Sequence, residues 1–170
     1  LGNYAYIASH QWSALTIVDI SNPTNPTYVW SAWTATHPNG VVVYGKYAFV
    51  SIYNIRAVQV FDVSNPASPT LLTTYSYPTS INAALIRLYW RYLVMGSYSN
   101  SLNIIDVSNP AAPVGYVWSV SAGGYGFDIS GDLIYSVDGS STLWVTRMPG
   151  LEANAWYIYN LRAWELSVDT

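Results

Sequence analysis

Three aspartates that recur at a nearly constant spacing are the first residues in this chain to suggest chemistry. Asp19, Asp62 and Asp106 are 43 and then 44 residues apart, and one apolar residue separates each from the same Ser-Asn-Pro sequence. A ring of carboxylates would suit a metal ion or general acid-base catalysis. However, an aspartate that begins a turn has a simpler role, because its side chain accepts hydrogen bonds from backbone N–H groups two residues on.

Repetition in every intact unit favours the turn role over a unique site. We therefore predict a structural turn rather than a catalytic site at each repeat. The predicted turn residues are Asp19, Asn22, Pro23, Asp62, Asn65, Pro66, Asp106, Asn109 and Pro110. No catalytic residue and no metal ligand is assigned among them.

Two other groups of polar residues suggest metal binding less strongly. His10 and His37 are the only histidines, and they fall in different parts of consecutive units without a nearby third ligand. Asp128, Asp132 and Asp138 lie close together, but their spacing does not fit the alternating loop that wraps calcium. We interpret them as loop histidines and turn-flanking acids, and we expect no metal and no cofactor.

Linear catalytic motifs are absent as well. The sequence has no Gly-rich phosphate loop, no Gly-x-Ser-x-Gly nucleophile turn and no His-Glu-x-x-His helix. It also has no cysteine, which excludes thiol chemistry. The sequence therefore predicts that the chain is not an enzyme.

The elements that carry these residues are short strands. In the second unit, residues 41–44 and 47–51 are apolar strands joined by the tight turn Gly45-Lys46, and further strands follow at 57–62 and 70–75. Two prolines in the intervening corner cannot lie in a central strand. Each unit of about 43 residues is thus predicted to be one four-stranded antiparallel blade.

The predicted fold is an all-β propeller of about four such blades, forming a closed small ring or part of a larger propeller. Residues 1–170 make a single propeller domain or a fragment of one, with units that begin near residues 4, 47, 92 and 133. The segment 163–168 resembles a first strand, and pairing it beside residues 4–8 would close a ring. In a longer protein it would begin a fifth blade.

One turn departs from the repeat. Units two and four have Gly45 and Gly131 at the first turn, whereas unit three has Trp90. A tryptophan at positive φ is strained, so we expect this turn to differ or the preceding loop to absorb two extra residues. In unit four, Arg147-Met148-Pro149-Gly150 replaces the Asp-Val-Ser-Asn-Pro pattern, as in a degraded terminal repeat.

The composition limits the partners. Charged residues are 9% of the chain against roughly 25% in ordinary soluble domains. The net charge is −3 and the basic residues form no run, which argues against nucleic-acid binding. The most apolar window is shorter than the roughly 20 residues of a spanning helix, so no membrane-spanning segment is expected. Aromatic residues reach 16%, which predicts contacts with other protein subunits, or with glycans.

Three tryptophans are the candidate interaction aromatics. Trp30 and Trp118 occupy matching places in Tyr-Val-Trp sequences of outer strands, and Trp33 follows the first of them. Exposed rings there can stack on a sugar or pack on a neighbouring subunit. Packing between blades is the alternative role.

Leu15-Thr16-Ile17-Val18-Asp19 and Leu102-Asn103-Ile104-Ile105-Asp106, each followed by a Ser-Asn-Pro turn, resemble the LVIVD repeat family. The resemblance covers about three of the four units. It implies a β-propeller of the secreted, surface or virus-encoded type, mostly without an assigned reaction. The family has no general catalytic motif to transfer.

Three functions remain open at this point. We expect a non-enzymatic structural or protein-interaction module of a cell-surface, extracellular or virion assembly, acting as an oligomer. The alternative is a carbohydrate-binding, lectin-like propeller that uses exposed Trp and Tyr. The third is a hydrolase or lyase with a site at the channel mouth, because propellers can assemble sites from unrelated loops.

Overall fold

The computed structural model describes residues 2–77, 83–97, 101–121, 126–137, 142–148 and 158–162. These residues form fifteen β-strands in four antiparallel sheets, which we name blades A to D in chain order. Within these ranges there is no helix long and apolar enough to cross a membrane.

Each blade pairs its strands in chain order. Blade A contains β1 (Tyr4–Ser9), β2 (Ala14–Asp19) and β3 (Thr27–Trp33). Blade B contains β4 (Pro38–Tyr44), β5 (Tyr47–Ile52), β6 (Ala57–Asp62) and β7 (Thr70–Ser76). Blade C contains β8 (Ala83–Tyr89), β9 (Tyr92–Ser97), β10 (Ser101–Asp106) and β11 (Val114–Ser121). Blade D contains β12 (Gly126–Ser130), β13 (Leu133–Val137), β14 (Thr142–Arg147) and β15 (Ile158–Arg162).

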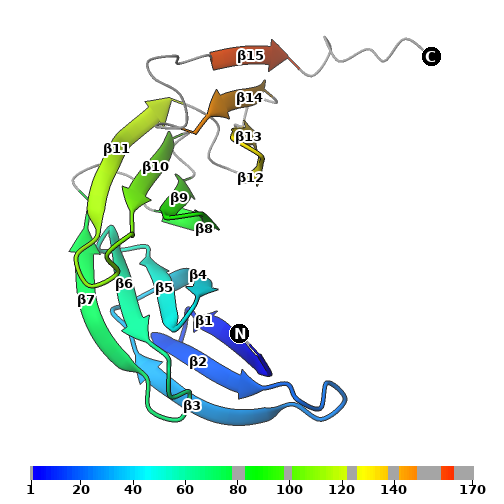
Figure 1. Cartoon of the computed structure of the whole chain (residues 1–170), viewed down its shortest axis with the longest axis vertical. Helices are drawn as coiled ribbons and strands as arrows, with labels where there is room; N and C mark the ends of the chain where they lie inside the picture. The colour runs from blue at the N-terminus through cyan, green and yellow to red at the C-terminus, as the bar shows by residue number, and fades with distance from the viewer. Residues whose placement is uncertain are drawn as a thin grey trace.

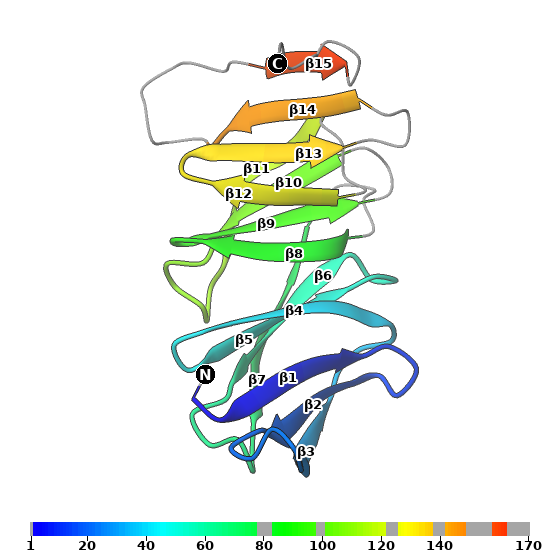
Figure 2. The same ribbon diagram turned by 90° about the vertical axis from the view of Figure 1, so that its right-hand side faces the viewer.

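The four blades follow one another along an arc, with blades A and D at its two ends (Figure 1). Strands β3, β7 and β11 lie on the convex side, and Figure 2 looks onto the concave side, where β1, β4, β8 and β12 face the viewer. The predicted all-β propeller architecture of about four blades is confirmed. The segment 163–168, predicted to be a further strand, lies outside the described residues.

The repeat extends to the fine structure of the strands. The second strand of a unit begins at Tyr4, Tyr47, Tyr92 and Leu133, as β1, β5, β9 and β13. A register shift interrupts the pairing of β2 with β3, of β6 with β7 and of β10 with β11 at the equivalent position in each blade. Such an irregularity increases the local twist, which helps successive blades to splay outward.

Among the described residues, the core consists of three apolar clusters, one at each junction between neighbouring blades. The buried members of the A–B cluster are Leu15, Ile17, Ala32, Ala48, Val50, Ile52, Phe61 and Val63. Those of the B–C cluster are Phe49, Val58, Val60, Tyr77, Ile86, Leu93, Met95, Ile105 and Val107. Those of the C–D cluster are Tyr92, Val94, Leu102, Ile104, Phe127, Ile134 and Met148.

These clusters explain why the central strands are apolar on both faces. In β6, Val58 and Val60 belong to the B–C cluster, whereas Phe61 belongs to the A–B cluster. Because successive side chains point to opposite faces of a strand, a blade that is covered on both sides needs apolar residues at nearly every position. Four of the six residues in Ala-Val-Gln-Val-Phe-Asp are apolar, and the buried Gln59 accepts a hydrogen bond from the Ala35 N–H.

Candidate functional site

The strands alternate in direction, so the turns fall at two ends of the blades. One end carries the repeated Asp-x-Ser-Asn-Pro corners and the two-residue turns, such as Gly45-Lys46; we name it the corner end. The other carries the β1–β2 turn, the β3–β4 link and the β5–β6 turn; we name it the loop end. The two ends are built differently.

The corner end repeats the same hydrogen bonds in three blades. Asp19, Asp62 and Asp106 each accept a hydrogen bond at Oδ1 from the backbone N–H of Ser21, Ser64 and Ser108, at 2.7, 2.8 and 2.8 Å. Asn22, Asn65 and Asn109 accept one in the same way from Thr24, Ala67 and Ala111, each at 3.2 Å. Pro23, Pro66 and Pro110 follow these asparagines within the corners.

These contacts affect the acidity of two corner aspartates. The pKa of Asp62 is lowered, first by hydrogen bonds from the side chain and backbone of Ser64 and further by Lys46. The pKa of Asp19 is lowered by hydrogen bonds from Ser21. Both carboxylates are therefore held in the ionised form that accepts the turn hydrogen bonds.

An ion pair joins each corner to the adjacent two-residue turn in blades B, C and D. Lys46 Nζ lies 3.5 Å from Asp62 Oδ2, and Arg91 Nε lies 3.3 Å from Asp106 Oδ2. In blade D the charges are exchanged, because Arg147 stands at the corner and its Nε lies 3.0 Å from Asp132 Oδ2. The fourth unit, predicted to be degraded, thus keeps the contact with reversed polarity.

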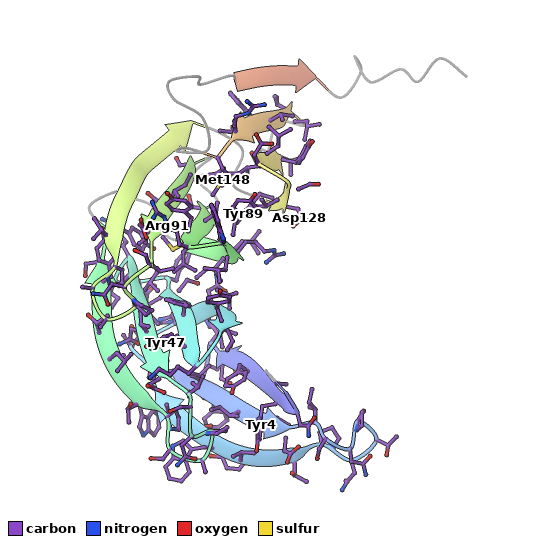
Figure 3. All side chains as sticks on the ribbon, in the orientation of Figure 1. Tyr4, Tyr47, Tyr89, Arg91, Asp128 and Met148 are labelled. Carbon is purple, nitrogen blue, oxygen red and sulfur yellow. The ribbon has the colours of Figure 1, made fainter. Side chains whose placement is uncertain are left out.

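The acidic group Asp128, Asp132 and Asp138 is divided between different contacts. Asp132 pairs with Arg147. Asp128, labelled in Figure 3, belongs to blade D, and its Oδ1 lies 4.0 Å from Nε of Arg87 in blade C. Asp138 lies outside the described residues. In the part of the chain that is described, no three His, Cys, Asp or Glu side chains gather as a metal-binding group.

The loop end brings together residues that the sequence analysis kept apart. His10 of the β1–β2 turn and His37 of the β3–β4 link are edge to face, with ring centroids 4.7 Å apart at 69°. The third member is Asn54 of the β5–β6 turn, whose Nδ2 lies 2.6 Å from His37 Nδ1. We name His10, His37 and Asn54 the histidine cluster.

The backbone holds His37 in this position. Its φ of +62° lies in the left-handed region, which a non-glycine residue adopts at a cost. Its carbonyl oxygen accepts a hydrogen bond from the backbone N–H of Tyr53 at 3.0 Å. The link is thus tied to the β5–β6 turn by both a backbone and a side-chain contact, and strained backbone of this kind is common at functional sites.

The sequence did not predict the histidine cluster, because its members are far apart in the chain. The order of the turns could have predicted this proximity. In an antiparallel sheet the chain reverses at each turn, so every second turn lies at the same end of the blades. The β1–β2, β3–β4 and β5–β6 connections are therefore all at one end. The contacts between the side chains of His10, His37 and Asn54 follow from the packing of blade A on blade B, which the order of the turns does not reveal.

The predicted interaction aromatics separate in space. Trp33 is 81% exposed and pairs with Ala14, whereas Trp30 is about half exposed and pairs with Ile17, whose side chain is in the A–B core. Neighbouring residues of paired strands share a face, so the two tryptophans lie on opposite faces of blade A. Trp118 belongs to β11, and the structure does not describe its side chain.

Trp33 borders a groove of about 530 Å³ on blade A. At its base Thr16 Oγ1 lies 2.9 Å from Ser9 Oγ and 3.1 Å from Ser31 Oγ, which forms a row of hydroxyl groups. Trp12 and Tyr28, both exposed, complete the rim. The predicted protein or glycan partner of these aromatics stays a prediction.

Several solved structures share this fold at low sequence identity. A protein from Lactobacillus plantarum has a TM-score of 0.77 at 12% identity, over 94% of this chain and 54% of that chain. The periplasmic gluconolactonase PpgL of Pseudomonas aeruginosa has a TM-score of 0.76 at 15% identity, over 95% and 50%. A proposed 6-phosphogluconolactonase from Bacteroides uniformis has a TM-score of 0.72 at 13% identity, over 94% and 50%. The chain spans about half the length of these structures.

These likenesses correct two expectations. A non-enzymatic structural or protein-interaction module was expected, and so was a chain that is not an enzyme. Both expectations are contradicted, because the same fold occurs in a periplasmic gluconolactonase and in a proposed 6-phosphogluconolactonase. The physical reason is that the prediction relied on motifs of neighbouring residues. A propeller instead gathers side chains from turns far apart, as the histidine cluster shows.

Sequence comparison identifies the repeat itself. No curated protein matches the chain in sequence. The LVIVD repeat matches at residues 1–34, 37–77 and 83–117, which together span more than half of the chain and coincide with blades A, B and C. The chain therefore belongs to the LVIVD repeat family.

Proposed function

We propose that the chain belongs to a hydrolase that opens a cyclic ester of a sugar acid at the histidine cluster. The observation that carries the proposal is the meeting of His10, His37 and Asn54 at the loop end. The names of the similar solved structures, a gluconolactonase and a proposed 6-phosphogluconolactonase, support the substrate class.

The contact between Asn54 and His37 assigns different roles to the two imidazoles. When the amide Nδ2 donates to His37 Nδ1, the proton of the neutral His37 ring is on Nε2. His37 is then a hydrogen-bond donor that can polarise the lactone carbonyl and stabilise its developing negative charge. Asn54 acts through His37 and is a positioning residue.

His10 is the candidate general base. It is exposed and close to His37, so a water molecule can reach it beside a substrate held at the second imidazole. In the reaction, His10 takes a proton from water while the water oxygen bonds to the carbonyl carbon. The ring C–O bond then breaks, the ring oxygen takes that proton, and the product is an open-chain hydroxy acid.

The test is hydrolysis of glucono-δ-lactone, followed by acid release in a pH-stat and corrected for the spontaneous reaction. We expect the full chain to accelerate ring opening, and we expect His10→Gln and His37→Gln each to lower the rate about 100-fold or more. Asn54→Ala is expected to have a smaller effect, because it removes only the orientation of His37. Asp62→Asn is the control, since Asp62 lies at the corner end, away from the histidine cluster.

Two results would contradict the proposal. One is a wild-type chain that leaves the spontaneous rate of ring opening unchanged. The other is catalysis that survives both histidine substitutions, which would move the reaction away from the loop end.

We also infer a secreted or periplasmic location. The likeness to a periplasmic gluconolactonase and the low proportion of charged residues support it. A cell-surface or virion location is the narrower prediction. Fractionation of the producing cell into cytoplasm, envelope and medium tests both, and recovery of the protein in the cytoplasm would contradict them.

A further inference from the structure

One turn of the corner end carries a residue that its backbone disfavours. The four equivalent turns begin with Gly2, Gly45, Trp90 and Gly131, at φ values of +63°, +56°, +57° and +59°. Trp90 thus adopts the same turn as the glycines, so the first alternative expected from the sequence, a different turn, is wrong. The second alternative concerns the preceding loop, and residues 78–82 of that loop lie outside the described residues. A side chain in this left-handed region clashes with its own backbone, a cost that glycine avoids.

The fold gains little from this tryptophan. Its side chain is 73% exposed, so it contributes little to the apolar core. The glycine in the equivalent turn of blade B has open space around the position of an added Cβ, so these turns do not demand a large side chain. A strained, exposed aromatic residue that packing does not explain indicates a binding role.

Trp90 lines a cleft of about 780 Å³ at the corner end, between the turns of blades B and C. This volume is within the range of small-molecule sites. Tyr47 and Arg91, labelled in Figure 3, come from the two neighbouring blades. The aromatic lining residues are Tyr44, Tyr47, Phe49, Trp90 and Tyr92.

The charges of the cleft are already paired. Lys46 is 3.5 Å from Asp62 and Arg91 is 3.3 Å from Asp106, while both cations remain about half exposed. Lys46 also lies over the Tyr47 ring at 5.4 Å, and Arg91 lies over the Tyr92 ring at 5.1 Å. An anionic ligand would have to compete with these aspartates, so the pairing favours a neutral one.

The remaining chemistry fits a sugar. Aromatic rings offer flat apolar surfaces for the C–H face of a pyranose. Lys46 and Arg91 offer N–H donors, and Ser108 offers a hydroxyl group, to the hydroxyl groups at the edge of the sugar. A flat aromatic ligand would stack on the rings but would offer few acceptors to these donors at its edge, so a sugar uses more of the chemistry of the cleft.

We propose that the cleft lined by Trp90, Lys46 and Arg91 is a binding site for a neutral pyranose unit of a carbohydrate. The site is separate from the proposed function, because the cleft lies at the corner end and the histidine cluster lies at the loop end. Loss of either activity therefore leaves the other to be measured.

The experiment screens the full chain against glucose, galactose and xylose oligosaccharides, with polygalacturonate as the acidic probe. The best neutral oligosaccharide is then titrated calorimetrically against the wild type and three variants. We expect Trp90→Gly to weaken binding about tenfold or more through loss of stacking. Trp90→Phe, which keeps a ring, should retain part of the affinity. Leu72→Ala should retain all of it, because Leu72 is an exposed residue of β7 that does not line the cleft.

Trp90→Gly also separates a binding role from a structural one. Because glycine occupies the other three turns, this variant should melt at the same temperature as the wild type or higher. A lower melting temperature would show that Trp90 stabilises the fold and would overturn the argument. So would unchanged binding by Trp90→Gly, loss of binding in Leu72→Ala, tighter binding of polygalacturonate, or no binding of any probe by the folded wild type.

Discussion

The corner end and the loop end of the blades follow different rules. At the corner end, the same aspartate hydrogen bond recurs in blades A, B and C, and an ion pair recurs in blades B, C and D. At the loop end, His10, His37 and Asn54 come from three different connections and form one cluster. A repeated contact supports each blade equally, whereas a contact made once can serve a single substrate.

The corner end itself contains one residue that departs from the repeat. Trp90 stands where Gly2, Gly45 and Gly131 stand, so one turn of the scaffold departs from the other three in residue type while keeping their backbone. Departure from the repeat is therefore the common property of both sites proposed above. If the corner end supplies stability and the loop end supplies chemistry, substitutions at the two ends should have different effects.

The largest expected effect is on the core beside a corner. Phe61 precedes Asp62 and is buried in the A–B cluster. Phe61→Ala should lower the free energy of unfolding by about 3 to 5 kcal/mol, because it removes a buried ring and leaves a cavity. His37→Ala, at the loop end, should lower it by about 1 kcal/mol or less, because it removes one exposed hydrogen bond, with Asn54. Urea denaturation of both variants measures the contrast, and similar losses in the two would remove the distinction.

The reversed ion pair of blade D gives the next largest effect. Arg147→Asp would place two carboxylates together at the corner and should lower the free energy of unfolding by about 1.5 kcal/mol. The double variant Asp132→Arg with Arg147→Asp restores the polarity of blades B and C, and we expect it to recover most of the loss. Denaturation of the single and double variants forms the cycle. Additive losses would show that the pair does not stabilise blade D.

The reversed pair also shows where sequence reasoning fails. The repeat period, the strand pattern and the corners were readable because each follows from neighbouring residues. In contrast, unit four looked degraded because Asp132 and Arg147 are separated in sequence and each has the charge opposite to that of its counterparts. An ion pair is preserved when its two residues exchange their charges. A comparison of one position at a time sees two changed residues and therefore predicts that the contact is lost.

The candidate site was less predictable than the fold. The sequence separated His10 from His37 because they occupy different parts of their units, and neither belongs to a motif. Their contact depends on the packing of blade A on blade B, which is a property of the A–B core rather than of the turns. The strained turn at Trp90 was noticed in the sequence, but the tryptophan adopts positive φ rather than avoiding it.

A moderate effect is expected from the corner aspartate itself. Asp62→Asn keeps the size of the side chain, but it weakens the hydrogen bond from Ser64 and removes the ion pair with Lys46. We expect a loss of about 1 kcal/mol in the free energy of unfolding. Lactone hydrolysis should be unchanged, because Asp62 is at the opposite end from the histidine cluster. Loss of hydrolysis with an unchanged melting curve would give this aspartate a functional role.

The smallest effect is the response of stability to acid. Because the pKa of Asp62 and that of Asp19 are lowered in the folded chain, the unfolded chain binds more protons than the folded chain below the ordinary value of 3.8. Their contribution to stability is therefore complete above that value and decreases as the pH falls toward the folded pKa of each group. Melting temperatures measured from neutral to acid pH should decrease in this range.

Asp62→Asn isolates the share of one corner in this acid response. The variant cannot titrate at residue 62, so its melting temperature should fall less steeply with acid than that of the wild type, although it starts lower. The substitution thus lowers the melting temperature at neutral pH, and the difference in melting temperature between the variant and the wild type becomes smaller in acid. Parallel curves for the two proteins would mean that Asp62 titrates equally in the folded and unfolded chains, and its turn contacts would then stabilise the corner without favouring the charged form.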